Sequence, residues 1–140
     1  MIVCVVDGQG GKIGGAIITR LKERLRERIE IIALGTNSSA TESMMKARAN
    51  RGASGENAIV TTVRKADIVI GTMNILLADS MLGEFTPPMA RAIADSPALK
   101  LILPVTQEKV VVVGKAELSI PQMIGVLVDE VEKEADKCAR

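Results

Sequence analysis

The chain has 140 residues, of which 47% are hydrophobic, and its 18 basic and 17 acidic side chains leave a formal net charge of +1. This length and apolar content fit a single domain over residues 1–140. A nearly neutral chain whose only aromatic residue is Phe85 offers neither a basic patch nor stacking platforms, so we expect no nucleic-acid partner. We also expect no membrane association, because no apolar run reaches the roughly 18 residues of a spanning helix.

The missing residue types limit the chemistry that the chain could perform. It has no His and no Tyr, which excludes Ser-His-Asp and Cys-His catalysis, the commonest metal ligand, and Tyr-dependent hydride transfer. We therefore expect no metal site, and any proton transfer would use Asp, Glu, Lys, Cys or water. The two cysteines, Cys4 and Cys138, form no disulfide framework and favour a reduced, cytoplasmic protein.

Strand-like and helix-like segments alternate from the start of the chain. Residues 1–6 form a continuous apolar run typical of a strand that is buried on both faces. Residues 12–28 place apolar side chains at helical spacing, and residues 29–34 predict a second strand. Ser39 and Glu42 then fit a capping box that opens a second helix.

The alternation continues to the end of the chain. In chain order we predict a turn at 50–55, a helix at 56–64, a strand at 66–72, an irregular apolar segment at 73–85, a helix capped by Thr86 with Pro87 in its first turn, strands at 99–105 and 110–114, and a last helix opened by a Ser119–Gln122 capping box. Only residues 106–109 separate the last two strands, too few for a parallel crossover. These two strands therefore pair antiparallel or are not neighbours.

This pattern predicts an α/β fold, a single Rossmann-like three-layer domain. Its sheet of about five strands is mainly parallel, with helices on both faces. Ligands of such sheets bind beyond the carboxyl ends of the strands, at the point where the strand order reverses. Three segments should meet there, namely residues 7–14, 35–39 and 71–74.

The stretch DGQGGKIGG, residues 7–15, joins the first predicted strand to the first predicted helix. Gly8, Gly11 and Gly14 follow a G-x-x-G-x-x-G spacing. Gly8 and Gly10 also fit a dinucleotide-binding G-x-G start. Glycine lets the backbone approach a ligand, and a helix N-terminus offers unpaired N–H groups and a positive dipole end to a phosphate. We predict a phosphate site formed by Gly8, Gln9, Gly10, Gly11, Lys12, Ile13 and Gly14.

The alternative is that these glycines only allow the first helix to pack closely on the sheet. If the loop binds phosphate, a branched side chain at Gly11 would occupy the phosphate position, and Gly11→Val would abolish binding.

Two known loops resemble this one. GQGGKIG is similar to the GAGGRMG type of dihydrodipicolinate reductases, with Lys12 where that family has Arg. It also resembles the short-chain dehydrogenase loop T-G-x-x-x-G-x-G, but Asp7 replaces the Thr and Lys12 replaces a Gly. Both resemblances imply binding of NAD(P) and are confined to the loop with its flanking strand and helix.

Polar residues follow the second predicted strand. Thr36, Asn37 and Ser38 stand where an acid usually holds the ribose of NAD. They could bind a 2′-phosphate with help from Lys46 or Arg48, which would favour NADP. They could equally form a turn and cap a helix, since these residue types favour both positions.

The third predicted strand ends in Gly71, Thr72 and Asn74. Asn74 could bind a ribose or a substrate, although a turn residue is the simpler interpretation. Asp7 could hold a metal or act as a base at the tip of the first strand. We expect it instead to fix the glycine loop by accepting hydrogen bonds from N–H groups of the loop.

Five segments carry a resemblance over nearly the whole chain: DGQGGKIG, IIALGTNSSAT, GASGENAIV, DIVIGTMNILLADSMLGEFTP and ILPV. Together they resemble a small bacterial family of uncharacterised proteins, the domain of unknown function 3842. The resemblance implies a stand-alone Rossmann-like domain and no established activity.

Two functional hypotheses follow. The first is a nucleotide- or dinucleotide-binding protein, with NAD(P) as cofactor and an oxidoreductase-like role. A homo-oligomer would complete its site, with the apolar residues 75–85 as the contact. The second is a non-catalytic module that senses a phosphorylated metabolite or assembles with other copies. The absence of recognisable catalytic residues favours the second hypothesis.

Overall fold

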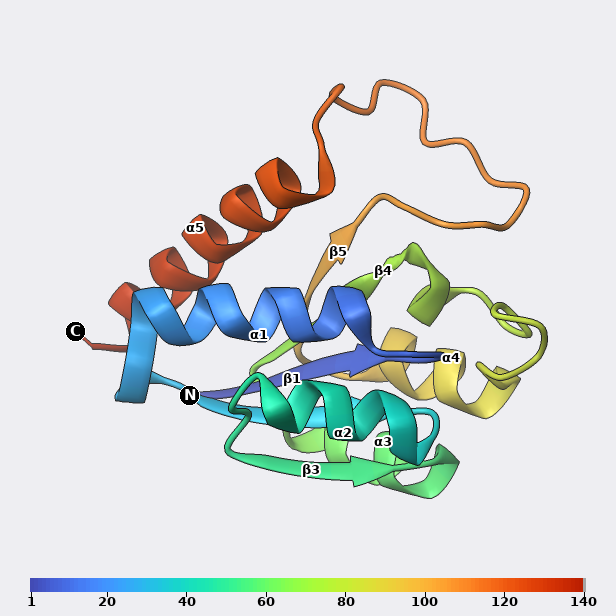
Figure 1. Cartoon of the computed structure of the whole chain (residues 1–140), viewed down its shortest axis with the longest axis horizontal. Coiled ribbons are helices and arrows are strands. Elements are labelled where there is room, and N and C mark those ends of the chain that lie inside the picture. The colour runs from blue at the N-terminus through green and yellow to red at the C-terminus, as the bar shows by residue number, and fades with distance from the viewer. Residues whose placement is uncertain (140) are drawn as a thin grey trace.

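A computed structural model describes residues 1–139 and shows one parallel sheet with the strand order β3-β2-β1-β4-β5 (Figure 1). The strands are β1 (Ile2–Asp7), β2 (Glu30–Gly35), β3 (Arg51–Ser54), β4 (Ile68–Thr72) and β5 (Leu99–Leu103). Every neighbouring pair runs parallel, so all five carboxyl ends lie at the same edge of the sheet.

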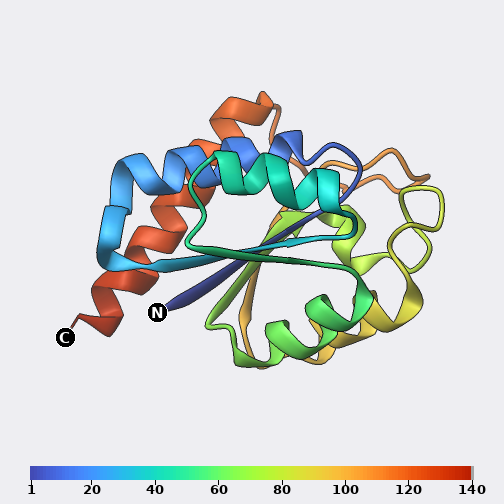
Figure 2. The same ribbon diagram turned by 60° about the horizontal axis from the view of Figure 1, so that its bottom comes forward.

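Helices cover both faces of the sheet, as Figure 2 shows. They are α1 (Lys12–Leu25), α2 (Ser38–Lys46), α3 (Glu56–Thr62), α4 (Pro87–Asp95) and α5 (Ile120–Cys138), with short 3-10 helices at Arg26–Arg28, Val63–Lys65 and Met73–Leu76. The first, second and last helices pack on one face, while α3 and α4 pack on the other. The predicted three-layer α/β fold is therefore confirmed.

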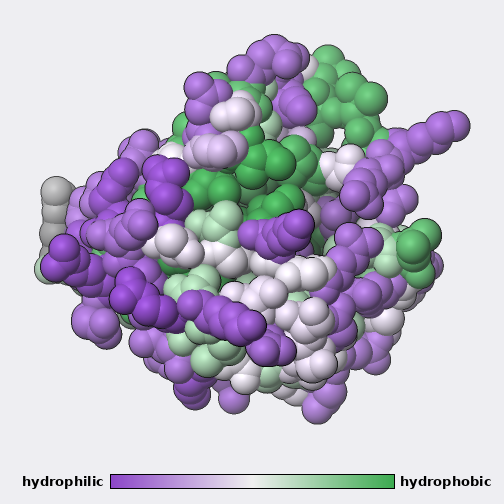
Figure 3. Space-filling model, viewed as in Figure 1, coloured by the Kyte–Doolittle hydropathy of each residue, from purple (hydrophilic) through white to green (hydrophobic). Residues whose placement is uncertain are grey.

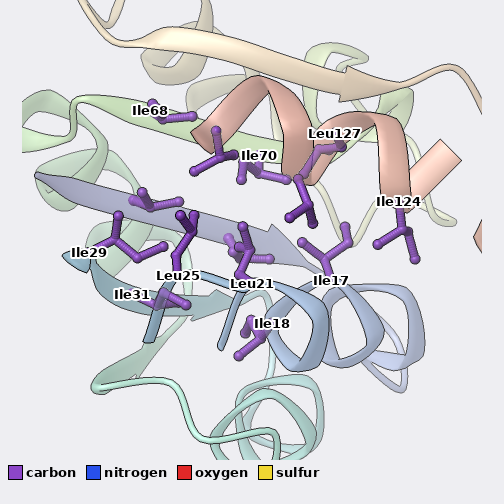
Figure 4. Packing of buried hydrophobic residues seen from close by; sticks show 14 of the residues in the cluster. Ile17, Ile18, Leu21, Leu25, Ile29, Ile31, Ile68, Ile70, Ile124 and Leu127 are labelled. Carbon is purple, nitrogen blue, oxygen red and sulfur yellow. The ribbon is translucent and has the colours of Figure 1, made fainter. Parts of the chain in front are cut away.

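Alternation along β1 explains why its apolar run is continuous. Val3 and Val5 point to the cluster under α1 and α5, whereas Cys4 and Val6 point to the cluster under α3 and α4. Figure 4 shows the first of these clusters, in which side chains of α1 and α5 meet those of the sheet. All four β1 residues are at most 1% exposed, so the strand is buried on both faces and anchors the loop that follows it.

Two strand predictions at the sheet edges were wrong. Residues 51–54, predicted as a turn, form the edge strand β3, whose four residues are all exposed and pair through their backbone with β2. Residues 110–114, predicted as a strand, lie in a long loop without regular structure between β5 and α5 (Figure 1). Val111 and Val113 of this loop are 86% and 94% exposed, so β-forming side chains alone do not make a strand without a paired neighbour.

The start of α2 also differs from the prediction. Asn37, and not Ser39, is the capping residue, and its side-chain oxygen accepts a hydrogen bond of 2.8 Å from the N–H of Ala40. The capping box of Ser119 and Gln122 at the start of α5 is confirmed, as is Pro87 in the first turn of α4. In the described part of the chain, the apolar stretches of the helices are too short to cross a membrane.

Candidate functional site

A cleft of about 530 Å³ opens at the carboxyl edge of the sheet. It is lined by residues 7–13 at and beyond the end of β1, by Thr72 and Asn74 at and beyond the end of β4, by Met81, by residues 105–107 after β5, and by Ile120. The chain leaves β1 toward β2 on one side and later returns to β4 on the other, so the cleft lies at the reversal of strand order. The first and third of the predicted segments therefore line one cavity.

The glycine loop leaves several backbone donors unused. The N–H of Gly11 bonds to the oxygen of Gly8 at 3.0 Å, and the N–H of Gly15 bonds to the oxygen of Gly11 at 2.9 Å. Within residues 1–139, no hydrogen bond uses the N–H groups of Gly10, Lys12 and Ile13. These free donors stand at the positive end of α1 and line the cleft, which suits an anion.

Asp7 holds the loop from its inner side. Its carboxylate accepts a hydrogen bond of 2.8 Å from the N–H of Gly8 and one of 2.7 Å from the N–H of Gly14. Burial raises the pKa of Asp7 above its usual value, against the opposing effect of these two hydrogen bonds. The prediction that Asp7 fixes the loop through its N–H groups is confirmed.

The close contacts of the loop glycines are with protein atoms. A Cβ on Gly11, whose φ is +69°, would lie 2.6 Å from the backbone oxygen of Ala40. A Cβ on Gly14 would lie 2.7 Å from the sulfur of Met44. Both positions face α2, so the expectation that a side chain at Gly11 would enter the phosphate position is wrong. Only Gly10 faces open space, with no atom within 4 Å of an added Cβ.

Glu84 is the residue of this region that the sequence did not reveal. Its carboxylate oxygen Oε1 accepts hydrogen bonds from the N–H of Gln9 at 2.7 Å, from the amide of Asn37 at 3.0 Å and from the hydroxyl of Thr36. A Cβ on Gly8 would lie 2.8 Å from the same oxygen. Glu84 therefore joins the glycine loop to the end of β2, although it lies 75 residues away from Gln9.

The residues at the end of β2 have structural partners. Asn37 caps α2 and also donates to the oxygen of Gln9 at 3.2 Å, and Thr36 contacts Glu84. Ser38 is exposed and forms the first residue of α2. Lys46 and Arg48 lie at the opposite end of α2, too far along the helix to assist a phosphate at its start.

The residues at the end of β4 divide between packing and the cleft. Gly71 is buried, and a Cβ there would lie 2.7 Å from Ile75. Thr72 and Asn74 line the cleft, where the side-chain oxygen of Asn74 accepts a 2.6 Å hydrogen bond from the hydroxyl of Thr106. Asn74 thus ties the end of β4 to the loop that follows β5.

Cys4 does not take part in the cleft. Burial raises the pKa of this thiol to about 12, so it stays protonated and unreactive in the core. Among residues 1–139, no group of three or more Cys, Asp or Glu side chains is arranged to hold a metal ion.

The parallel sheet, with a glycine loop at the reversal of strand order, defines a Rossmann-like α/β domain. The chain belongs to the family described as Domain of unknown function (DUF3842), whose family model matches residues 2–136. A search of curated proteins found no match to the chain. The whole-chain resemblance seen in the sequence is confirmed, whereas the likeness of the glycine loop to reductase loops stays a prediction.

Gly11 and Gly10 form a matched pair for testing the packing of the loop. We expect Gly11→Ala to lower the free energy of unfolding by about 1–3 kcal/mol, because it combines a left-handed backbone with a clash against α2. Gly10→Ala should change it by less than about 0.5 kcal/mol, since its Cβ meets open space. Urea denaturation measures both values, and equal stabilities would contradict the packing role of Gly11.

The pKa values of the two carboxylates that hold the loop, Asp7 and Glu84, should be shifted in opposite directions. Asp7 should titrate above the usual Asp value of about 3.9. Burial raises the pKa of Glu84, but hydrogen bonds from Thr36, Gln9 and Asn37 outweigh it, so Glu84 should titrate below about 4.3. The carboxyl carbon signals of the two side chains report both pKa values by NMR.

The same shifts have opposite effects on stability. The contribution of Glu84 is complete above about pH 4.3 and is lost as the pH falls through its folded-state pKa. For Asp7, stability decreases as the pH rises from about 3.9 through its raised pKa. Glu84→Gln should therefore remove part of the loss of stability at acidic pH, measured by urea denaturation as a function of pH. If the free energy of unfolding of the variant falls with acidification as steeply as that of the wild-type protein, Glu84 does not have the lowered pKa.

Proposed function

We propose that this protein binds a nucleotide or dinucleotide of the NAD(P) type, with a phosphate group at the start of α1. The observation that carries the proposal is that Gly10, Lys12 and Ile13, whose N–H groups have no acceptor within the described residues, line a cleft of about 530 Å³. Free backbone donors at a helix N-terminus suit a phosphate because the helix dipole adds to their hydrogen bonds. The exposed ammonium of Lys12 lines the same cleft and adds positive charge.

Asp7 is compatible with a phosphate in this position. Both of its oxygens accept hydrogen bonds from loop N–H groups, so its carboxylate is oriented by Gly8 and Gly14. This arrangement shapes the loop and leaves the neighbouring donors available to a ligand. Asp7 therefore acts as a positioning residue.

The proposal places binding ahead of catalysis. Among the residues that line the cleft, Asp7 and Lys12 are the titratable ones, and Asp7 is engaged with the loop. General acid–base chemistry needs a titratable group within reach of the reacting atom. A sensing or carrier role for the bound nucleotide thus fits this cleft better than an oxidoreductase reaction completed by its own side chains.

Calorimetric titration with NAD, NADP, ATP and ribose 5-phosphate tests the proposal. We expect Gly10→Asp to weaken binding of the phosphorylated ligand by at least about tenfold, because it adds a carboxylate beside the free N–H groups without a steric clash. Gly10→Asn is the matched control, with nearly the same shape and no charge. A wild-type protein that binds none of the four compounds overturns the proposal.

A second candidate function is assembly with other copies of the chain, through the loop between β5 and α5. In the expected contact at residues 75–85, Ile75, Met81 and Phe85 are buried, whereas Leu76 and Leu82 are exposed. The long loop of residues 104–119 instead extends from the body, and Figure 3 shows apolar side chains on this side of the molecule. Val111 and Val113 are almost fully exposed, and β5 forms an unpaired edge of the sheet.

Charged substitutions distinguish the two surfaces. If a second copy docks on the valines, Val111→Asp should shift the mass measured by light scattering from oligomer to monomer, because a carboxylate would be buried in the contact. Leu82→Asp is the comparison, since Leu82 is even more exposed than Val111 and lies in the segment first expected to make the contact. A protein that is monomeric before substitution contradicts assembly, and a larger effect at Leu82 would return the contact to residues 75–85.

A further inference from the structure

We propose that Glu84, which is bonded to the cleft-lining residue Gln9 but does not itself line the cleft, binds the ribose of a ligand that extends toward the end of β2. The protein would then accept a nucleotide with a free 2′-hydroxyl and discriminate against a 2′-phosphate. This inference rests on the proposed function and names its ligand more closely. It departs from one of the two alternatives drawn from Thr36, Asn37 and Ser38, in which the end of β2 binds a 2′-phosphate.

Glu84 lies against the end of β2. Rossmann-like domains that bind NAD usually present an acid to the ribose hydroxyls at the end of β2. Here β2 ends at Gly35 and is followed by Thr36 and Asn37, both of which donate hydrogen bonds to Glu84. The acid that is missing from this strand end is therefore supplied by a segment from much later in the chain.

One oxygen of the Glu84 carboxylate is free to accept a hydrogen bond from a ligand. Oxygen Oε1 of Glu84 receives all of the protein hydrogen bonds to this side chain, from Gln9, Thr36 and Asn37. In the described chain, no protein donor is bonded to its second oxygen, Oε2. A carboxylate held at one oxygen and free at the other can accept a hydrogen bond from a ribose hydroxyl.

The carboxylate of Glu84 is held in place before a ligand arrives. The turn that precedes it has left-handed backbone at Asp79, Met81 and Leu82, and at Gly83. Buried Met81 and Phe85 anchor this turn on either side of Glu84, and the N–H of Asp79 bonds to the oxygen of Phe85 at 2.8 Å. A fixed acceptor binds a ligand without the entropy cost of ordering a side chain.

Charge decides between the two kinds of ribose. The hydrogen bonds to Glu84 keep its pKa below the usual range despite the opposing effect of burial, so the side chain is ionised near neutral pH. A 2′-phosphate beside it would be repelled unless basic groups were close. Lys46 pairs with Glu42 at 3.6 Å near the far end of α2, and Arg48 lines a separate cleft with Lys22, so neither offsets this charge.

Calorimetric titration of two ligand pairs tests the inference. The wild-type protein should bind NAD at least about tenfold more tightly than NADP, and ADP at least about tenfold more tightly than 2′-deoxy-ADP, since each weaker ligand loses a hydrogen bond to a charged group. Glu84→Gln should reduce both ratios to within about threefold. Glu56→Gln is the control, because Glu56 accepts a hydrogen bond from the hydroxyl of nearby Thr86 but, within the described residues, makes none with Gln9, Thr36 or Asn37.

The outcomes separate this inference from the proposed function. If the wild-type protein binds NAD and NADP with equal affinity, or if Glu84→Gln leaves both ratios unchanged, Glu84 only holds the loop to β2 and the inference is overturned while nucleotide binding stands. If none of the four nucleotides binds, the proposed function fails together with it. The comparison within the wild-type protein does not depend on the folding of the variant.

Discussion

The two hydrogen bonds that Asp7 accepts from Gly8 and Gly14 hold the glycine loop at the carboxyl edge of the sheet. They tie the end of β1 to the first turn of α1. Because the N–H of Gly14 is used in this way, the free donors at the start of α1 are those of Gly10, in the preceding loop, and of Lys12 and Ile13, and all three residues line the cleft. The donor set that suits a phosphate is thus a consequence of an internal carboxylate.

A second carboxylate lies on the other side of the same loop. Asp7 is held by backbone N–H groups from within, whereas Glu84 covers Gly8 from outside and links Gln9 to the end of β2. Burial is the largest effect on the pKa of both side chains, but at Glu84 three hydrogen bonds together outweigh it, so the two pKa values move in opposite directions. The loop therefore lies between two acids, and its free donors belong to Gly10, Lys12 and Ile13, which line the cleft.

Sequence reasoning succeeded where local pattern decides the structure. The apolar alternation of β1, the glycine loop, the local role of Asp7 and the capping box at Ser119 all depend on neighbours in the chain. It failed at β3, whose exposed residues have no apolar pattern and pair only through their backbone, and at residues 110–114, whose valines have no partner strand. Glu84 could not be predicted for the same reason, since its partners are set by the tertiary fold and not by spacing.

The two candidate functions meet in the segment that follows β5. Residues 105–107 line the cleft, and Thr106 holds Asn74 while Glu108 accepts a 3.1 Å hydrogen bond from the N–H of Met81. The exposed valines come only a few residues later in the same loop. A second copy docked on these valines would restrain residues 105–107, which line the cleft. A nucleotide bound in the cleft would in turn restrain the same residues of the loop that carries the valines. Coupling between sites is reciprocal, so each event would strengthen the other if both select the same loop conformation.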